Sequence, residues 1–241
     1  MQTERKTLEG FFCKEFPEVP NLPAWITDEL IQYWEDNLFD IHYLPKISLD
    51  QSIDLPSWTD RPDQAFYQKV KEGKLQIKAK ELSGKWILID ARAKPEKRSP
   101  WISATDVKIL QKTRINPKKH LGKWQKQLHE QEYLKEHLKM RGFGSRFCLS
   151  PADIHELKPF VSDYLKIDPK KMIRLPYFIE FNYLGNACYP QWRTTKTWEW
   201  FQDQMVDGSH LAGGSQSVGI VGWDPADHWS TILGFRVVIE L

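Results

Sequence analysis

The spacing of apolar residues in the first 90 positions predicts two helices and two strands. Residues 27–38 carry apolar side chains at helical spacing, and Thr27 is placed to cap the first turn. A second helix is expected over residues 60–72, after a loop-like stretch. The alternating run at residues 74–82 and the apolar run at residues 86–89 predict strands, and the second strand should be buried.

Two strand-to-helix transitions are expected in the second half of the chain. Ser150 is a good cap for a helix that has proline in its first position, and Pro159 should kink or split that helix. Residues 173–175 are expected to be extended, and Pro176 should then open a helix that ends at Gly185. Strand pieces and long loops follow, so the whole pattern predicts an α+β domain.

The pattern also divides the chain into regions. Residues 1–75, rich in Pro, Trp and acidic side chains, are expected to form an N-terminal helical extension packed on a main domain of residues 76–241. A basic helical insertion is expected at residues 104–141. Within residues 106–141, eight Lys and two Arg stand against one Asp and three Glu. This excess of positive charge fits a nucleic-acid surface or a solvated helix face, and we favour the solvated face.

The composition is typical of a globular protein with reduced cysteines. The chain has 241 residues, of which 41% are hydrophobic and 27% charged, and its net charge of +2 gives no global attraction to nucleic acid or membranes. No apolar run approaches the roughly 20 residues of a membrane-spanning helix, and no signal core is evident, so the default location is cytoplasmic. Cys13, Cys148 and Cys188 form no recognisable disulfide or metal-ligand pattern, and neither a cofactor nor a metal is expected.

Four short motifs fall in a fixed order along the last 68 residues. They are Arg174-Leu175-Pro176 with Glu180-Phe181-Asn182-Tyr183, then Thr197-Trp198-Glu199-Trp200, then Gly213-Gly214-Ser215, and finally Gly234-Phe235-Arg236. This order resembles the formylglycine-generating enzyme (sulfatase-modifying factor) family, which is a variant of the C-type lectin fold. The resemblance implies a C-type lectin-like fold of that variant, in which the motifs serve as framework and the last of them opens a half-buried terminal strand.

The resemblance does not extend to the catalytic residues. Formylglycine-generating enzymes carry their chemistry on a pair of cysteines, one of them directly after the G-F-R motif. Here that position is Val237, and no cysteine follows Cys188, so an oxidoreductase of this class is disfavoured. Glu180, Glu199 and Asp203 are conceivable acids, but nothing supplies a paired base or nucleophile. We therefore expect no enzyme.

The segment between the third and fourth motifs has no helical or strand period. Together with residues 145–165, 175–186 and 197–204, it resembles the variable proteins of diversity-generating retroelements. In those proteins, which have the C-type lectin fold, mutagenic reverse transcription directed at adenines randomises chosen codons. The resemblance implies a non-enzymatic, receptor-like ligand-binding protein with a variable region at about residues 200–233.

In such a protein, side chains that face a ligand are held between fixed elements. The expected anchors are Trp198, Trp200, Gly213, Gly214, Phe235 and Val237. The expected ligand-binding positions are Gln216, Val218, Ile220, Trp223, Asp224, Asp227, His228, Trp229, Ser230 and Ile232. Apolar side chains rimmed by Asp and His are typical of a protein-binding hot spot, although Trp223 and Trp229 could equally belong to the core. The expected partner is an unidentified protein or other macromolecule, and nucleic acid is not expected.

Overall fold

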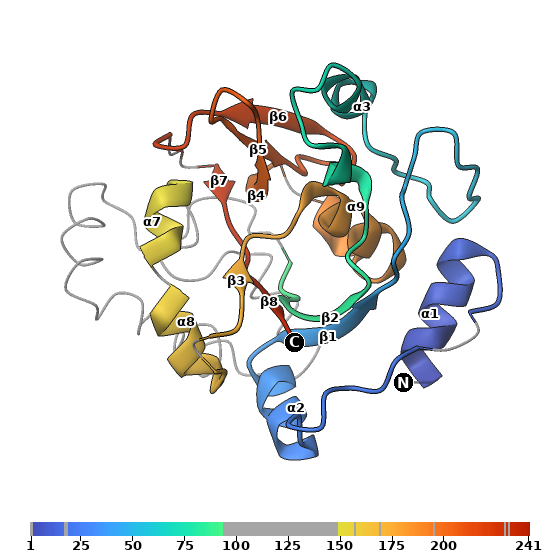
Figure 1. The fold of residues 1–241 in the computed structure, drawn as a ribbon, viewed down its shortest axis with the longest axis vertical. Helices are drawn as coiled ribbons and strands as arrows, with labels where there is room; N and C mark the ends of the chain where they lie inside the picture. The colour runs from blue at the N-terminus through green and yellow to red at the C-terminus, as the bar shows by residue number, and fades with distance from the viewer. Residues whose placement is uncertain are drawn as a thin grey trace.

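Two four-stranded sheets form the framework of the computed structural model (Figure 1). It describes residues 2–16, 19–93 and 149–241, apart from residues 157, 169, 195, 229 and 231. The first sheet has the strand order β1-β2-β8-β3, and the second has the order β6-β5-β4-β7. The bounds are β1 Phe39–Leu44, β2 Lys85–Asp90, β3 Ile173–Arg174, β4 Trp198–Gln204, β5 His210–Gly213, β6 Val221–Asp224, β7 Leu233–Gly234 and β8 Val238–Glu240. Neighbouring strands are antiparallel except β4 and β7, which are parallel.

Helices cover both sides of these sheets, so the expected α+β class is confirmed. Their bounds are α1 Gln2–Phe12, α2 Asp28–Asp36, α3 Gln64–Lys71, α7 Pro151–Glu156, α8 Lys158–Leu165 and α9 Phe178–Ala187, with 3-10 helices η1 Ile77–Lys80 and η2 Pro190–Arg193. In Figure 1, α7 and α8 lie on one side and α1 and α3 on the other. Helix α9 packs against α1, β4 and β5.

Local signals placed the starts of two helices correctly. The Thr27 side chain accepts a hydrogen bond from the Leu30 backbone N–H (3.3 Å) at the start of α2, as expected. Helix α7 begins at Pro151, directly after Ser150, and a second helix, α8, has Pro159 as its second residue.

Four expectations about local structure were wrong. Two of them are helix starts, because α3 begins at Gln64 instead of residue 60 and α9 begins at Phe178 instead of Pro176. The run at residues 74–82 is not a strand but contains η1, because its buried residues Leu75, Ala79 and Leu82 follow helical rather than alternating spacing. Helix α9 also continues to Ala187, past its expected end at Gly185.

The N-terminal region supplies more than the helical extension expected for residues 1–75. Strand β1 pairs with β2 along its whole length, from Phe39 opposite Asp90 to Leu44 opposite Lys85. Side chains from α1 and from the loop before α3 are part of the same buried cluster as α9. The region therefore completes the first sheet and its core.

The C-terminal strand β8 lies between β2 and β3, inside the first sheet. Its neighbouring side chains enter two different hydrophobic clusters: Val238 packs with the cluster around α9, and Ile239 with the cluster around α8. The expectation of a half-buried terminal strand was therefore wrong. Both faces are covered, and Arg236, which precedes the strand, is 0% exposed.

Candidate ligand-binding site

Two buried ion pairs involve charged side chains of three of the four sequence motifs. Two guanidinium nitrogens of Arg174 donate to the two carboxylate oxygens of Glu180 (2.7 and 2.8 Å). The Glu180 carboxylate also accepts from the Tyr177 backbone N–H (2.9 Å) at the start of α9. In the same way, Arg236 pairs with Glu199, and all four charged side chains are buried. The first pair connects the two parts of one motif, and the second fixes the last motif against the Trp198–Trp200 motif, which agrees with a framework role.

The Gly213-Gly214 turn closes a short loop that leads into β6. Gly214 has a φ of +88°, a conformation that favours glycine, and its N–H donates to the carbonyl of Ile220 (3.0 Å). A Cβ added to Gly213 would lie 2.3 Å from the same carbonyl oxygen. The two glycines are therefore required for the close approach of the two ends of the loop.

Distant residues hold the middle of this loop against the core. The carboxylate of Asp60 accepts hydrogen bonds from the Ser217 hydroxyl (2.6 Å) and the Val218 N–H (2.7 Å), and Asn182 donates to the Val218 carbonyl (2.9 Å). The Val218 side chain is 0% exposed and packs so closely on Gly185 that a Cβ there would lie 2.5 Å from it. The expectation that Val218 faces a ligand was therefore wrong.

Most of the other expected ligand-binding positions do reach the surface. Gln216, Ile220, Trp223, Asp227, His228 and Ile232 are exposed, and Asp224 and Ser230 are partly exposed, whereas Trp229 lies outside the described residues. Because Trp223 is 41% exposed, it is not a core residue. Among the expected anchors, Trp198 is only partly buried, and the other five are buried.

The exposed positions do not form one continuous patch. Trp223 and Asp224 are consecutive residues of β6, so their side chains point to opposite faces of the second sheet. The Trp223 ring lies 4.3 Å from the ammonium of Lys69 on α3. Asp224 is opposite His210 in the β5–β6 register, on the face towards α7. Strand β6 therefore divides the expected ligand-binding positions between the two faces of the second sheet.

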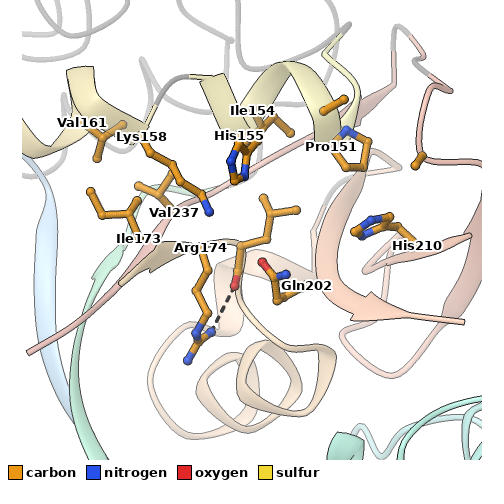
Figure 2. A pocket seen from close by; sticks show the side chains of 13 residues that line it. Pro151, Ile154, His155, Lys158, Val161, Ile173, Arg174, Gln202, His210 and Val237 are labelled. Carbon is orange, nitrogen blue, oxygen red and sulfur yellow. Dashed lines mark hydrogen bonds between the residues drawn. The ribbon is translucent and has the colours of Figure 1, made fainter. Parts of the chain in front are cut away.

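A pocket of about 440 Å³ opens on the α7 face (Figure 2). It lies between α7 and α8 on one side and β3, β4 and β5 on the other, and Ala226 from the loop after β6 also lines it. The described lining residues are Pro151, Ala152, Ile154, His155, Lys158, Val161, Ile173, Arg174, Leu175, Gln202, His210, Ala226 and Val237. Most of the wall is therefore apolar, with a few polar groups, as is usual for small-molecule sites.

The polar groups of the pocket are cationic or neutral. Figure 2 shows the side chains of His155 and Lys158 directed from α7 and α8 into the cavity, towards Gln202 and His210 on the strands. Arg174 instead turns its guanidinium away towards α9, where it pairs with Glu180 and Glu240. No carboxylate is present among the described residues that line the pocket.

Burial changes the titration of two of these groups. It lowers the pKa of Lys158, because the apolar surroundings disfavour the charged ammonium. It also lowers the pKa of His210, although the hydrogen bond between its Nδ1 and the Phe201 carbonyl (3.2 Å) opposes the effect. Both groups would be stabilised in their charged forms by an anion in the pocket.

The side chains considered as possible acids have structural contacts. Glu180 and Glu199 are in the buried ion pairs, and Asp203 accepts from the Phe178 N–H (2.6 Å). Val237 lies in the wall of the pocket, at the position where the resembling enzymes have a cysteine. In the described part of the chain, no group of three or more His, Cys, Asp or Glu side chains is arranged to hold a metal ion.

The sequence alone did not identify the pocket residues. His155 and Lys158 follow one another at the i, i+3 spacing of an ordinary solvated helix face, and His210 stands alone in its stretch of sequence. The expected basic insertion at residues 104–141 lies outside the described residues, as does Cys148. None of the described helices is long and apolar enough to span a membrane.

No protein-family model matches this sequence, and neither a curated protein nor a solved structure matches it.

Proposed function

We propose that this chain is a non-enzymatic ligand-binding protein with a C-type lectin-like fold of the formylglycine-generating-enzyme variant, and that a retroelement diversifies its C-terminal surface. One observation carries the proposal. Ile232 is 49% exposed, whereas Leu233 directly after it is 3% exposed and Phe235 is 1% exposed. Side chains that contribute little to the core thus lie between residues that hold the backbone, so the exposed set can change while the fold persists.

Strand pairing supports the fold part of the proposal. Strand β2, the first of the proposed lectin-like domain, pairs antiparallel with its last strand β8, and Leu88 lies opposite Ile239. The two ends of the domain are therefore side by side. The ion pair Arg174–Glu180 adds a contact within one motif, and Arg236–Glu199 adds a contact between two motifs, that the resemblance treats as framework.

The proposed partner is a protein or another macromolecule that contacts the edge of the second sheet. Strand β6 is the outer strand of that sheet, so a partner approaching its edge reaches side chains on both faces. Trp223 on one face and Ile220 in the loop before β6 offer large exposed apolar side chains of the kind that dominate protein interfaces.

The decisive test is the sequence of the locus that encodes this chain. We expect a near-copy of the 3′ coding segment beside a reverse-transcriptase gene, with differences at adenines. The differences should fall in codons of exposed positions such as Trp223, Asp227 and Ile232 and spare the codon of Val218. A locus without such a copy would contradict diversification, and differences concentrated in codons of buried residues would contradict a display role for the segment.

A further inference from the structure

The pocket between α7, α8 and the strands contains the ammonium group of Lys158. This ammonium has no hydrogen bond or ion pair with any described residue, although lysines such as Lys166 and Lys171 lie over aromatic rings. A partly buried ammonium directed into a largely apolar cavity has lost hydration, and the described residues give it no compensating contact.

Three neutral or titratable side chains surround the same space. His155 enters from α7, Gln202 from β4 and His210 from β5. His155 and Gln202 can each donate a hydrogen bond to an oxygen atom, and His210, whose Nδ1–H faces the Phe201 carbonyl, can donate from Nε2 when it is protonated. Arg174 is the other Lys or Arg among the described lining residues, and its guanidinium is bound to Glu180, Glu240 and the Leu175 carbonyl. The Lys158 ammonium is therefore available to form an ion pair with an anionic ligand.

Apolar side chains form the rest of the wall. Ile154, Val161 and Val237 line the pocket as members of one hydrophobic cluster, and each is at most 5% exposed. The apolar wall that they help to form can pack against an organic body, whereas a hydrated inorganic anion gains nothing from it. The pocket volume of about 440 Å³ lies within the usual range for small-molecule sites.

We infer that this pocket binds a small organic acid, with its carboxylate on Lys158 and its apolar body against Ile154, Val161 and Val237. The pocket is separate from the proposed display surface, which consists of the exposed ligand-binding positions between residues 216 and 232. Binding in the pocket does not depend on diversification of that surface. Ala226 is the one described pocket residue from the loop after β6, so the two sites adjoin without sharing the exposed positions Asp227 and Ile232.

Affinity should depend on pH through His210. A carboxylate favours the protonated imidazole, so binding takes up a proton, and affinity should rise from about pH 8 to about pH 6, where an organic acid is still ionised. The charged and titratable groups that face His210 are His155, Lys158 and Arg174 across the pocket and Asp224 across the β5–β6 pair.

The test is calorimetric titration of the full chain with 3-phenylpropionate, hexanoate and their primary amides. We expect the acids to bind, the amides and inorganic phosphate to bind at least about tenfold more weakly, and Lys158→Met to weaken acid binding at least about tenfold, or about 1.4 kcal/mol. Lys158→Arg should retain most of the affinity. Lys170→Met is the matched control, because Lys170 is exposed and does not line the pocket.

Two results would overturn the inference. One is the absence of acid binding by the unmodified chain over the whole pH range, and the other is acid binding that Lys158→Met and Lys170→Met affect equally. Asp227→Ala combined with Ile232→Ala should leave acid binding unchanged, because these residues do not line the pocket. Acid binding would therefore persist if the display proposal failed, and the display proposal would stand if acid binding failed.

Discussion

The guanidinium of Arg236 and the carboxylate of Glu199 form a two-point ion pair in the interior, across 37 residues of sequence. Nε donates to one carboxylate oxygen (2.5 Å) and Nη2 to the other (2.7 Å). The same guanidinium lies 3.7 Å from the centre of the Trp192 ring and donates to the Asp90 carbonyl at the end of β2. One side chain thus connects the last motif with β4, η2 and the first sheet, which explains why a buried charge is tolerated there.

The first prediction concerns this pair. Arg236→Met should lower the free energy of unfolding by about 3–5 kcal/mol, because it leaves the Glu199 carboxylate buried without its main partner. The double variant Glu199→Leu with Arg236→Met should be less destabilised than the sum of the two single variants. Urea unfolding of all four proteins measures this coupling. The exposed pair Arg5–Glu9 is the control and should show far weaker coupling, and equal coupling in both pairs would refute the interior role.

The second prediction compares exposed and buried positions of the C-terminal segment. Asp227→Ala, His228→Ala and Ile232→Ala should each change the free energy of unfolding by no more than about 0.5 kcal/mol, because these side chains are exposed. Phe235→Ala should cost about 3–5 kcal/mol, as for a buried aromatic residue. Thermal melts of the four variants suffice. If the three variants at exposed positions lost as much stability as Phe235→Ala, the display proposal would have no physical basis.

The third prediction uses two residues of one loop. Val218→Ala should lower the free energy of unfolding by about 2 kcal/mol, since it leaves a cavity against Gly185 on α9. Ile220→Ala, two residues later, should have little effect because Ile220 is 39% exposed. Chemical denaturation measures both. A tolerated Val218→Ala would show that the loop packs less tightly than its contacts with Asp60 and Asn182 indicate.

The fourth prediction concerns pH. Burial raises the pKa of Asp203 from its ordinary value of 3.8 to about 7, against the hydrogen bond from Phe178. Between about pH 4 and pH 7 the folded protein therefore holds a proton that the unfolded chain has lost, and the free energy of unfolding falls as pH rises through this window. The loss contributed by Asp203 is at most about 4 kcal/mol.

Asp203→Asn is the variant that isolates this effect. An amide does not titrate, and its oxygen can still accept the hydrogen bond from Phe178, so the variant should lose less stability than the unmodified chain from about pH 5 to about pH 8. Denaturant unfolding at several pH values provides the comparison. If the two stability curves ran parallel, Asp203 would not be the titrating group.

The expected ligand-binding positions show what a sequence pattern can and cannot predict about a site. The absence of periodicity after Gly214 correctly indicated exposed side chains at Ile220 and Ile232, and it left Trp223 open between surface and core. It did not predict that Val218 is buried. Residues distant in the sequence bury this loop side chain, and such contacts produce no periodic pattern in the neighbouring sequence. The division of Trp223 and Asp224 between two faces likewise depends on a four-residue strand, too short to recognise from alternation.

The sequence by itself determined the features that depend on neighbouring residues. The cap at Thr27, the helix interruption near Pro159 and the buried strand β2 follow from local hydrogen bonding, proline geometry and a continuous apolar run. The tertiary structure alone decided which distant groups meet. Asp60 reaches Val218 across 158 residues, and Lys158 and His210 face one pocket from a helix and a strand. Such contacts arise from the packing of whole elements, and no local spacing encodes them.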